Sequence, residues 1–145
     1  MSLNIDRRVQ NVSYEYKMPP LCVREWSTDE TLLRNLADVA KALDRNPIYL
    51  LKFLGIELGV QTRVNARPKQ YFIQGKHDGD MLQDVLDRYI QQFVLCEKCV
   101  SPHTKLRVSP DCKEIKLTCR CGHESNIPLH HKVSTVILRN PPEQA

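Results

Sequence analysis

The sequence predicts an α+β protein with an extended tail, a small α/β domain and a zinc ribbon of antiparallel strands. Two cysteine pairs, Cys96 with Cys99 and Cys119 with Cys121, lie about twenty residues apart, as a zinc ribbon requires. A strongly amphipathic helical pattern runs directly into the first pair, and short strand-like runs lie on both sides of it. The expected units are residues 1–20 (tail), 21–94 (α/β domain), 95–139 (zinc ribbon) and 140–145 (the start of a linker).

The first twenty residues maintain no helical period. Apolar residues are sparse there, and Pro19 and Pro20 close the segment. We expect a tail that is either disordered in isolation or laid against a partner.

Residues 27–45 carry two competing local signals. Ser27 and Glu30 are spaced as in a capping box, which predicts a helix running to Arg45. Alternatively, residues 31–35 form a strand and Asp38 caps a shorter helix. The local pattern alone favours the first interpretation.

The next elements have clearer boundaries. Pro47 suits the first turn of a helix predicted from Ile48 to Leu58, and Gly59 ends it. Residues 60–65 and 71–74 are predicted to be two short strands joined by a turn. The two helices that meet near Pro47 fit a helix-turn-helix motif, and they fit a generic packed pair equally well.

The clearest helix is predicted to follow a cap at Asp80. Its apolar residues recur at three- and four-residue steps and should face the core; they are Leu82, Val85, Leu86, Tyr89, Ile90 and Phe93. Within the ribbon, residues 104–108 and 114–118 are predicted to be strands, and residues 133–138 a third strand.

The four paired cysteines are predicted to bind one structural Zn²⁺, because four thiolates leave no open coordination position. The second pair has a single intervening residue and needs a tight turn, for which Gly122 suits the left-handed backbone. His123 is the reserve ligand, and Cys112 is a less favoured one. Buried free thiols or a disulfide are the other explanation. Since no signal peptide opens the chain, we expect Cys22 and Cys112 to be free thiols of a reducing compartment.

The formal net charge of +4 is unevenly distributed. Residues 1–94 carry 13 basic and 12 acidic side chains, whereas residues 95–145 carry 8 and 5. This mild excess permits contact with RNA but does not demand it. No apolar run approaches the ~20 residues of a membrane span, so we expect a cytoplasmic protein without membrane contact. A glycine-rich phosphate loop and a Ser/His/Asp set are both lacking, which favours a regulatory module over an enzyme.

Six groups of residues, spread in order along nearly the whole chain, form a distinctive set. They are Met1-Ser2-x-Asn4, Tyr14-x-Tyr16-Lys17-Met18-Pro19, Asp38-Val39-Ala40-Lys41-Ala42-Leu43, Glu57-Leu58-Gly59-x-Gln61-Thr62, Phe93-Val94-Leu95-Cys96 and Leu138-x-Asn140-Pro141-Pro142-Glu143. Together they resemble the amino-terminal module of eukaryotic translation initiation factor 5. The carboxy-terminal part of the initiation factor 2 beta subunit is the nearest related family.

The resemblance implies an α/β domain similar to initiation factor 1, with a strand at residues 31–35 and a helix from about Asp38. It implies a factor that binds the preinitiation complex on the small ribosomal subunit, near initiator tRNA and mRNA. Such a factor stabilises start-codon recognition and promotes GTP hydrolysis by initiation factor 2. Contacts with RNA or a partner are implied for Tyr14, Tyr16, Lys17 and Lys52.

Two acidic residues depart from the family pattern. Glu15 occupies the position of the family's arginine finger, and its carboxylate would be repelled by the phosphates that an arginine stabilises. Glu30 occupies the position of a family lysine. Arg7 or Arg8 are candidate substitutes for the finger.

Three hypotheses follow from these observations. The first is a factor of the factor-5 type that stimulates initiation factor 2. The second is a non-activating binding module, either a factor-5 mimic or a beta-subunit-like scaffold, and the two acidic replacements favour it. The third is a DNA-binding zinc ribbon with a helix-turn-helix, which accounts for the cysteines but not for the tail.

Overall fold

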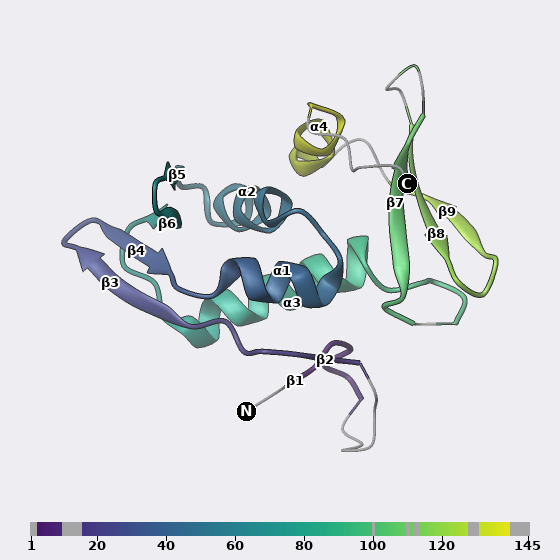
Figure 1. The fold of residues 1–145 in the computed structure, drawn as a ribbon, viewed down its shortest axis with the longest axis horizontal. Helices are drawn as coiled ribbons and strands as arrows, with labels where there is room; N and C mark the ends of the chain where they lie inside the picture. Colours follow the sequence, from purple (N-terminus) through teal and green to yellow (C-terminus); the bar gives the residue numbers. More distant parts are fainter. Residues whose placement is uncertain are drawn as a thin grey trace.

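Three antiparallel sheets and four helices make up the described part of the chain (Figure 1). The computed structural model describes residues 3–9, 16–99, 101–109, 111, 114–127 and 131–139. The elements are β1 (Leu3–Asn4), β2 (Lys17–Met18), β3 (Val23–Ser27), β4 (Glu30–Leu33), α1 (Leu36–Leu43), α2 (Pro47–Leu58), β5 (Thr62–Ala66), β6 (Lys69–Gln74), α3 (Gly79–Phe93), β7 (Thr104–Val108), β8 (Ile115–Cys119), β9 (Glu124–Asn126) and α4 (Lys132–Arg139).

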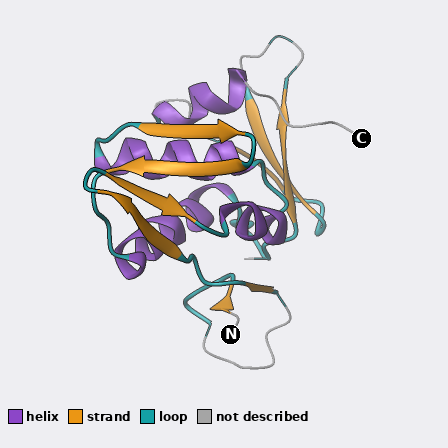
Figure 2. Cartoon of the chain, turned by 60° about the vertical axis from the view of Figure 1, so that its left-hand side comes forward, coloured by secondary structure: helices purple, strands orange, loops and turns teal. Residues whose placement is uncertain are grey.

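A four-stranded sheet in the order β3-β4-β6-β5 forms one layer of the α/β domain. The helices lie behind one face of this sheet, and the opposite face is open in the described part of the chain (Figure 2). Strand residues alternate between the two faces. Thr31, Leu33, Tyr71 and Ile73 point to the helix side and are buried.

Helix α2 lies at the centre of the core. The Asn46 side chain caps its start by accepting a hydrogen bond from the backbone N–H of Ile48 at 3.0 Å, and Gly59 ends it with φ +68°. Six of its residues are buried, too many for a single stripe, because α1, α3 and α4 all contact it. A Cβ at Gly55 would lie 2.7 Å from Thr62 Cγ2, so only glycine allows β5 this close.

Helix α3 confirms the predicted core stripe, since all six expected residues are buried. Its cap differs from the prediction, because the helix begins earlier and Asp78 rather than Asp80 is the N-cap. Asp80 lies in the first turn, where a carboxylate is favoured by the helix dipole.

The prediction of one helix from the Ser27 capping box to Arg45 is wrong. The Ser27 hydroxyl instead accepts a hydrogen bond from the backbone N–H of Asp29 at 3.3 Å, inside the turn between β3 and β4. Strand β4 and the shorter helix α1 follow this turn. The arrangement implied by the family resemblance is the observed one, although the N-cap is Asn35 and not Asp38.

The prediction of a third ribbon strand at residues 133–138 is also wrong. That segment is helix α4, and the third strand of the ribbon sheet is β9. The β-branched residues favoured a strand locally. Val133 and Ile137, four residues apart, instead share one helix face and are fully buried.

The described part of the predicted tail is folded against the domain. Strands β1 and β2 pair, with Leu3 opposite Met18, and the Ile5 N–H donates to the Tyr16 carbonyl at 3.0 Å. Ile5 and Met18 are buried in the main core. The predicted linker from residue 140 lies outside the described residues.

None of the described helices is long and apolar enough to cross a bilayer.

Candidate metal centre

Four cysteine sulfurs converge at the base of the ribbon. The Sγ atoms of Cys96, Cys99, Cys119 and Cys121 all lie within 4.8 Å of one another. The first pair lies on the turn that follows α3, and the second lies at the end of β8. Gly122 has φ +93°, the left-handed conformation expected for this tight turn, and its N–H donates to the Cys119 carbonyl at 2.9 Å.

The spacing of the sulfurs fits a tetrahedral metal ion. Cys96 and Cys121 Sγ are 3.8 Å apart, and Cys99 and Cys119 Sγ are 3.4 Å apart. Four sulfurs at about 2.3 Å from one Zn²⁺ would be separated by roughly 3.8 Å. The backbone N–H groups of Lys98 and Cys121 each point to a cysteine sulfur at 3.4 Å, as in tight turns that present thiolates. The donor set therefore fits a four-thiolate ion.

The cluster perturbs the ionisation of its own thiols. Burial raises the pKa of Cys96, but the N–H groups of Cys99 and Lys98 and the neighbouring thiols outweigh it, and the pKa is lowered to about 6. Burial raises the pKa of Cys119, and contacts with the other thiols of the cluster raise it further. A divalent cation would stabilise the thiolates together, since the ligands must be deprotonated to bind.

The alternative ligands do not join this cluster. His123 instead contacts Glu97, with Nε2 and Oε1 3.0 Å apart. Cys22 is an exposed free thiol near the Pro20 carbonyl, so that part of the prediction is confirmed. Cys112 lies outside the described residues.

The metal cluster is connected to the α/β domain through Arg45, which sequence reasoning missed. Its guanidinium donates to the Thr104 carbonyl at 2.8 Å, the Thr104 hydroxyl at 2.7 Å and the Phe93 carbonyl at 3.2 Å. Phe93 ends α3, three residues before Cys96, and Thr104 begins the ribbon sheet. Nothing in the local sequence distinguishes Arg45 from an exposed arginine after a helix.

A second contact joins the amino-terminal hairpin to the ribbon. The ring of Tyr16 lies edge-on to His103, with centroids 6.4 Å apart. Lys17, also expected to contact a partner, is exposed and donates to the Asn4 side chain. Tyr14 and Glu15 lie outside the described residues.

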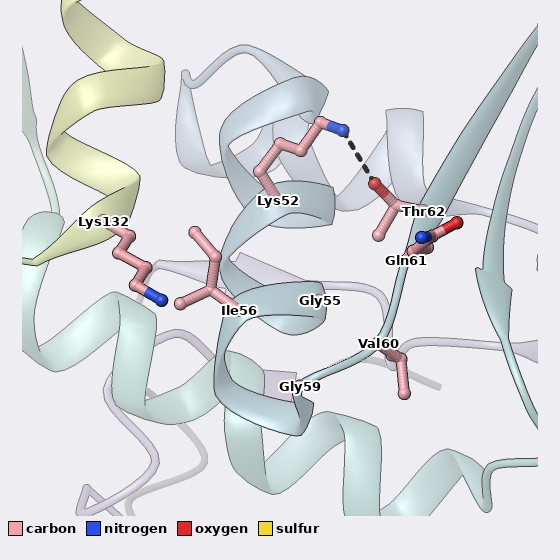
Figure 3. A pocket seen from close by; sticks show the side chains of 8 residues that line it. All are labelled: Lys52, Gly55, Ile56, Gly59, Val60, Gln61, Thr62 and Lys132. Carbon is pink, nitrogen blue, oxygen red and sulfur yellow. Dashed lines mark hydrogen bonds between the residues drawn. The ribbon is translucent and has the colours of Figure 1, made fainter.

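Lys52 lines a pocket of about 490 Å³ where α2, β5 and α4 meet (Figure 3). Its ammonium donates to the Thr62 hydroxyl at 2.9 Å. Lys132 comes from α4, and its side chain lies across Ile56 on the other side of α2. The sequence separates the two lysines by eighty positions, so only the packing of α4 on α2 brings them to one pocket.

The three other predicted charged residues are each engaged by an ion pair. Arg7 lies 3.4 Å from Asp87, and Arg8 contacts both carboxylate oxygens of Asp6, at 2.9 and 3.1 Å. Glu30 accepts from the Arg63 guanidinium with both oxygens, each at 3.0 Å.

Residues 6–124 match the model of a family described as a domain found in initiation factors 2B and 5. The chain is similar to eukaryotic translation initiation factor 5 of Mus musculus, with 42% identity over 149 residues that cover 100% of this chain and 35% of the relative. The factor of Caenorhabditis elegans is 42% identical over 147 residues (99% and 33%). That of Saccharomyces cerevisiae is 38% identical over 146 residues (99% and 36%). The chain thus spans about a third of the length of the curated relatives it matches.

Proposed function

The chain belongs to the family of the domain found in initiation factors 2B and 5, and from that membership we propose that it acts as a translation initiation factor of the factor-5 type. The observation that carries the proposal is similarity to initiation factor 5 at 42% identity along the whole chain. This also confirms the family resemblance predicted from the short motifs. The α/β domain would have a fold similar to initiation factor 1, and the role would place the protein in the cytoplasm.

In this role the chain binds the small ribosomal subunit beside initiator tRNA and mRNA. The positive ends of Lys17 and Lys52 and the rings of Tyr14 and Tyr16 are the contacts that we assign to RNA or to initiation factor 2. The location of Lys52 supports its assignment, because it lines an open pocket with Lys132 and without an acidic lining residue. Phosphate groups of RNA are the natural partners of paired ammonium groups.

The metal centre has a supporting part in this proposal. A four-thiolate site offers no position for substrate, so the ion that best suits it, Zn²⁺, would stabilise the ribbon rather than take part in chemistry. The ribbon in turn contacts the amino-terminal hairpin through His103 and Tyr16. We propose that the ion holds the surface against which residue 15 is presented.

Promotion of GTP hydrolysis by initiation factor 2 is the activity that we propose for this site. The alternative is a binding module that does not activate hydrolysis, and Glu15 favours it. Both substitute arginines would first have to leave a carboxylate, since Arg7 and Arg8 are paired with Asp87 and Asp6.

Single-turnover GTP hydrolysis by initiation factor 2 on small subunits separates the two candidates. The natural chain, its Glu15→Arg variant and a reaction without added factor are compared. Acceleration by the natural chain supports the activating role, whereas acceleration by the arginine variant alone supports a positioning role. If neither chain accelerates hydrolysis or binds the subunit, the factor-5 proposal is wrong.

Binding to the small subunit is measured in the same preparation. Lys52→Gln should weaken it, and Lys41→Gln, which removes an exposed lysine on α1 that does not line the pocket, should have a smaller effect. Equal effects of the two variants would show that only net charge matters.

A further inference from the structure

The open face of the four-stranded sheet carries an exposed aromatic side chain. Trp26 on β3 is 47% exposed, although it is the largest apolar side chain in the chain. One side of its ring covers Phe72 of β6, with centroids 5.3 Å apart. The rest of the indole faces solvent, where an apolar ring is unfavourable unless something covers it.

The strand register places arginines on both sides of this aromatic centre. Arg24, Leu32, Phe72 and Arg63 occupy one row across β3, β4, β6 and β5 and so point to the same face. The Arg63 guanidinium lies over the Phe72 ring, with Cζ 4.0 Å from its centroid. Arg24 is exposed and has no ion pair with any described residue.

The remaining outward positions carry amides and one carboxylate. Asn65 and Gln70 are opposite each other, and Gln74 is opposite Glu30. Glu30 is neutralised, because the Arg63 guanidinium donates to both of its oxygens. The face thus combines a free guanidinium, side-chain amides and an indole, and carries no unpaired negative charge among its described residues.

We propose that this face binds a single-stranded segment of RNA, with one unpaired base stacked on the exposed side of Trp26 and a phosphate held by Arg24. The proposal rests on the proposed function, which brings the chain to RNA, and it adds the ligand class and the residues. Aromatic rings and arginine planes are the groups on which proteins stack unpaired bases, and amides supply donors and acceptors to base edges. A duplex cannot use this face, because its bases are already stacked on one another.

The chain provides its own probe, because Trp26 is its only tryptophan. Binding of an eight-nucleotide uridine or adenosine oligomer should quench the tryptophan fluorescence in a saturable manner. An eight-base-pair RNA duplex at the same concentration should quench it far less. Affinity is measured independently by anisotropy of labelled oligomers, over a range of salt concentrations.

Four variants separate stacking from packing and from charge. Trp26→Leu keeps an apolar cover over Phe72 without the ring and should weaken oligomer binding at least about fivefold, since stacking of one base is worth that much or more. Trp26→Phe should bind close to the natural chain. Arg24→Gln should reduce the salt dependence of log affinity by about one phosphate contact. Met81→Ala removes a similarly exposed apolar side chain from α3 and should change nothing.

The proposal is overturned if Trp26→Leu binds the oligomers as tightly as the natural chain, or if oligomers bind without quenching. It is also overturned if purified initiation factor 2 quenches the fluorescence and RNA does not, since the face would then receive a protein. Binding of the chain to small subunits tests the proposed function separately. A chain that binds subunits but whose fluorescence ignores oligomers loses only the sheet-face assignment.

Discussion

The two arginines nearest in sequence to Glu15 are held in place by carboxylates, and this limits what either can do. Arg8 makes a two-pronged contact with Asp6, a buried carboxylate, and its hydrogen bonds lower the pKa of Asp6. Arg7 lies against Asp87 of α3, whose pKa is raised by burial. An arginine that reached a phosphate would leave one of these carboxylates without its partner. At this scale the structure favours a stabilising role for both.

The Asp6 contact predicts a pH dependence of stability. A folded-state pKa below the unfolded value, which is about 3.9, means that the native state favours the ionised carboxyl group. The contribution is therefore complete above about pH 5 and is lost as the pH falls through the folded-state pKa. Chemical denaturation of the natural chain and Asp6→Asn, at about pH 7 and at successively lower pH, should show the two stabilities converging. A constant difference down to about pH 2 would contradict the prediction.

The cysteine cluster makes a second prediction about single residues. Cys99→Ser removes one of four ligands, so zinc content should fall from one ion per chain to nearly none, and the ribbon should lose its fold. Cys22→Ser is the matched control, since Cys22 is a free thiol outside the cluster, and it should retain one ion. Elemental analysis of purified proteins measures the content, and circular dichroism reports the fold. Full zinc content in Cys99→Ser would exclude this ligand set.

At the scale of elements, α4 owes its existence to packing. Val133 and Ile137 are fully buried and join the main core, where α4 contacts α2. His131 anchors its start: Nδ1 accepts from the Val133 N–H at 3.1 Å, and Nε2 lies 2.8 Å from Glu57 of α2. The His131 ring also stacks on Phe53, with centroids 5.1 Å apart. The helix is therefore defined by residues more than seventy positions away.

Truncation of a core side chain in α4 tests this dependence. Ile137→Ala should reduce the free energy of unfolding by about 2–5 kcal/mol, through lost apolar burial and the cavity that remains. Thr135→Ala, on the exposed side of the same helix, should change it by less than about 0.5 kcal/mol. Urea denaturation gives both values. Similar small effects from the two variants would mean that α4 is not docked in solution.

The successes and failures of sequence interpretation follow the same division between local and distant causes. The α3 stripe, the α2 boundaries and the cysteine set were predictable, because periodicity, Gly59 and paired thiols act within a few residues. The Ser27 signal failed since the same hydroxyl can cap a helix or stabilise a turn. Strand β4 was decided by its pairing with β6, some forty positions later.

Parts of the candidate site were out of reach for the same reason. The pocket shared by Lys52 and Lys132, and the row that sets Arg24 beside Phe72, exist only after strands and helices have paired. Trp26 gave no signal in the sequence because a single tryptophan is most often part of a core. Its exposure is a property of the sheet.

At the scale of the whole molecule, Arg45 makes the ribbon and the α/β domain mutually dependent. Its side chain is only 8% exposed, and the acceptors of its guanidinium come from the ends of α1 and α3 and from Thr104 of the ribbon. Burial lowers the pKa of Arg45, while Tyr89, Asp44 and Tyr49 oppose the shift. The negative ends of two helix dipoles meet here, which stabilises a buried cation that has no carboxylate among its described hydrogen-bond partners.

This junction predicts that removal of the metal weakens helices that contain no ligand. Chelation should unfold the ribbon and take away both Thr104 acceptors, which leaves the buried guanidinium short of partners in the α/β domain. Amide hydrogen exchange should then accelerate in α1 and α3. Unchanged protection of these helices after complete chelation would show that the two units are independent.

A substitution at the junction should act in the opposite direction, from the α/β domain to the ribbon. Arg45→Met leaves the Thr104 and Phe93 carbonyls without their donor and should cost more than about 2 kcal/mol of stability, because hydrogen bonds to a charged group are strong. It should also increase the rate of zinc loss to a chelator, although Arg45 touches no cysteine. Arg34→Met, at an exposed position before α1, is the control for a lost positive charge and should leave both quantities unchanged. If Arg45→Met lowers stability while zinc is released at the natural rate, the junction supports the α/β domain alone, and the ribbon holds its ion without help from it.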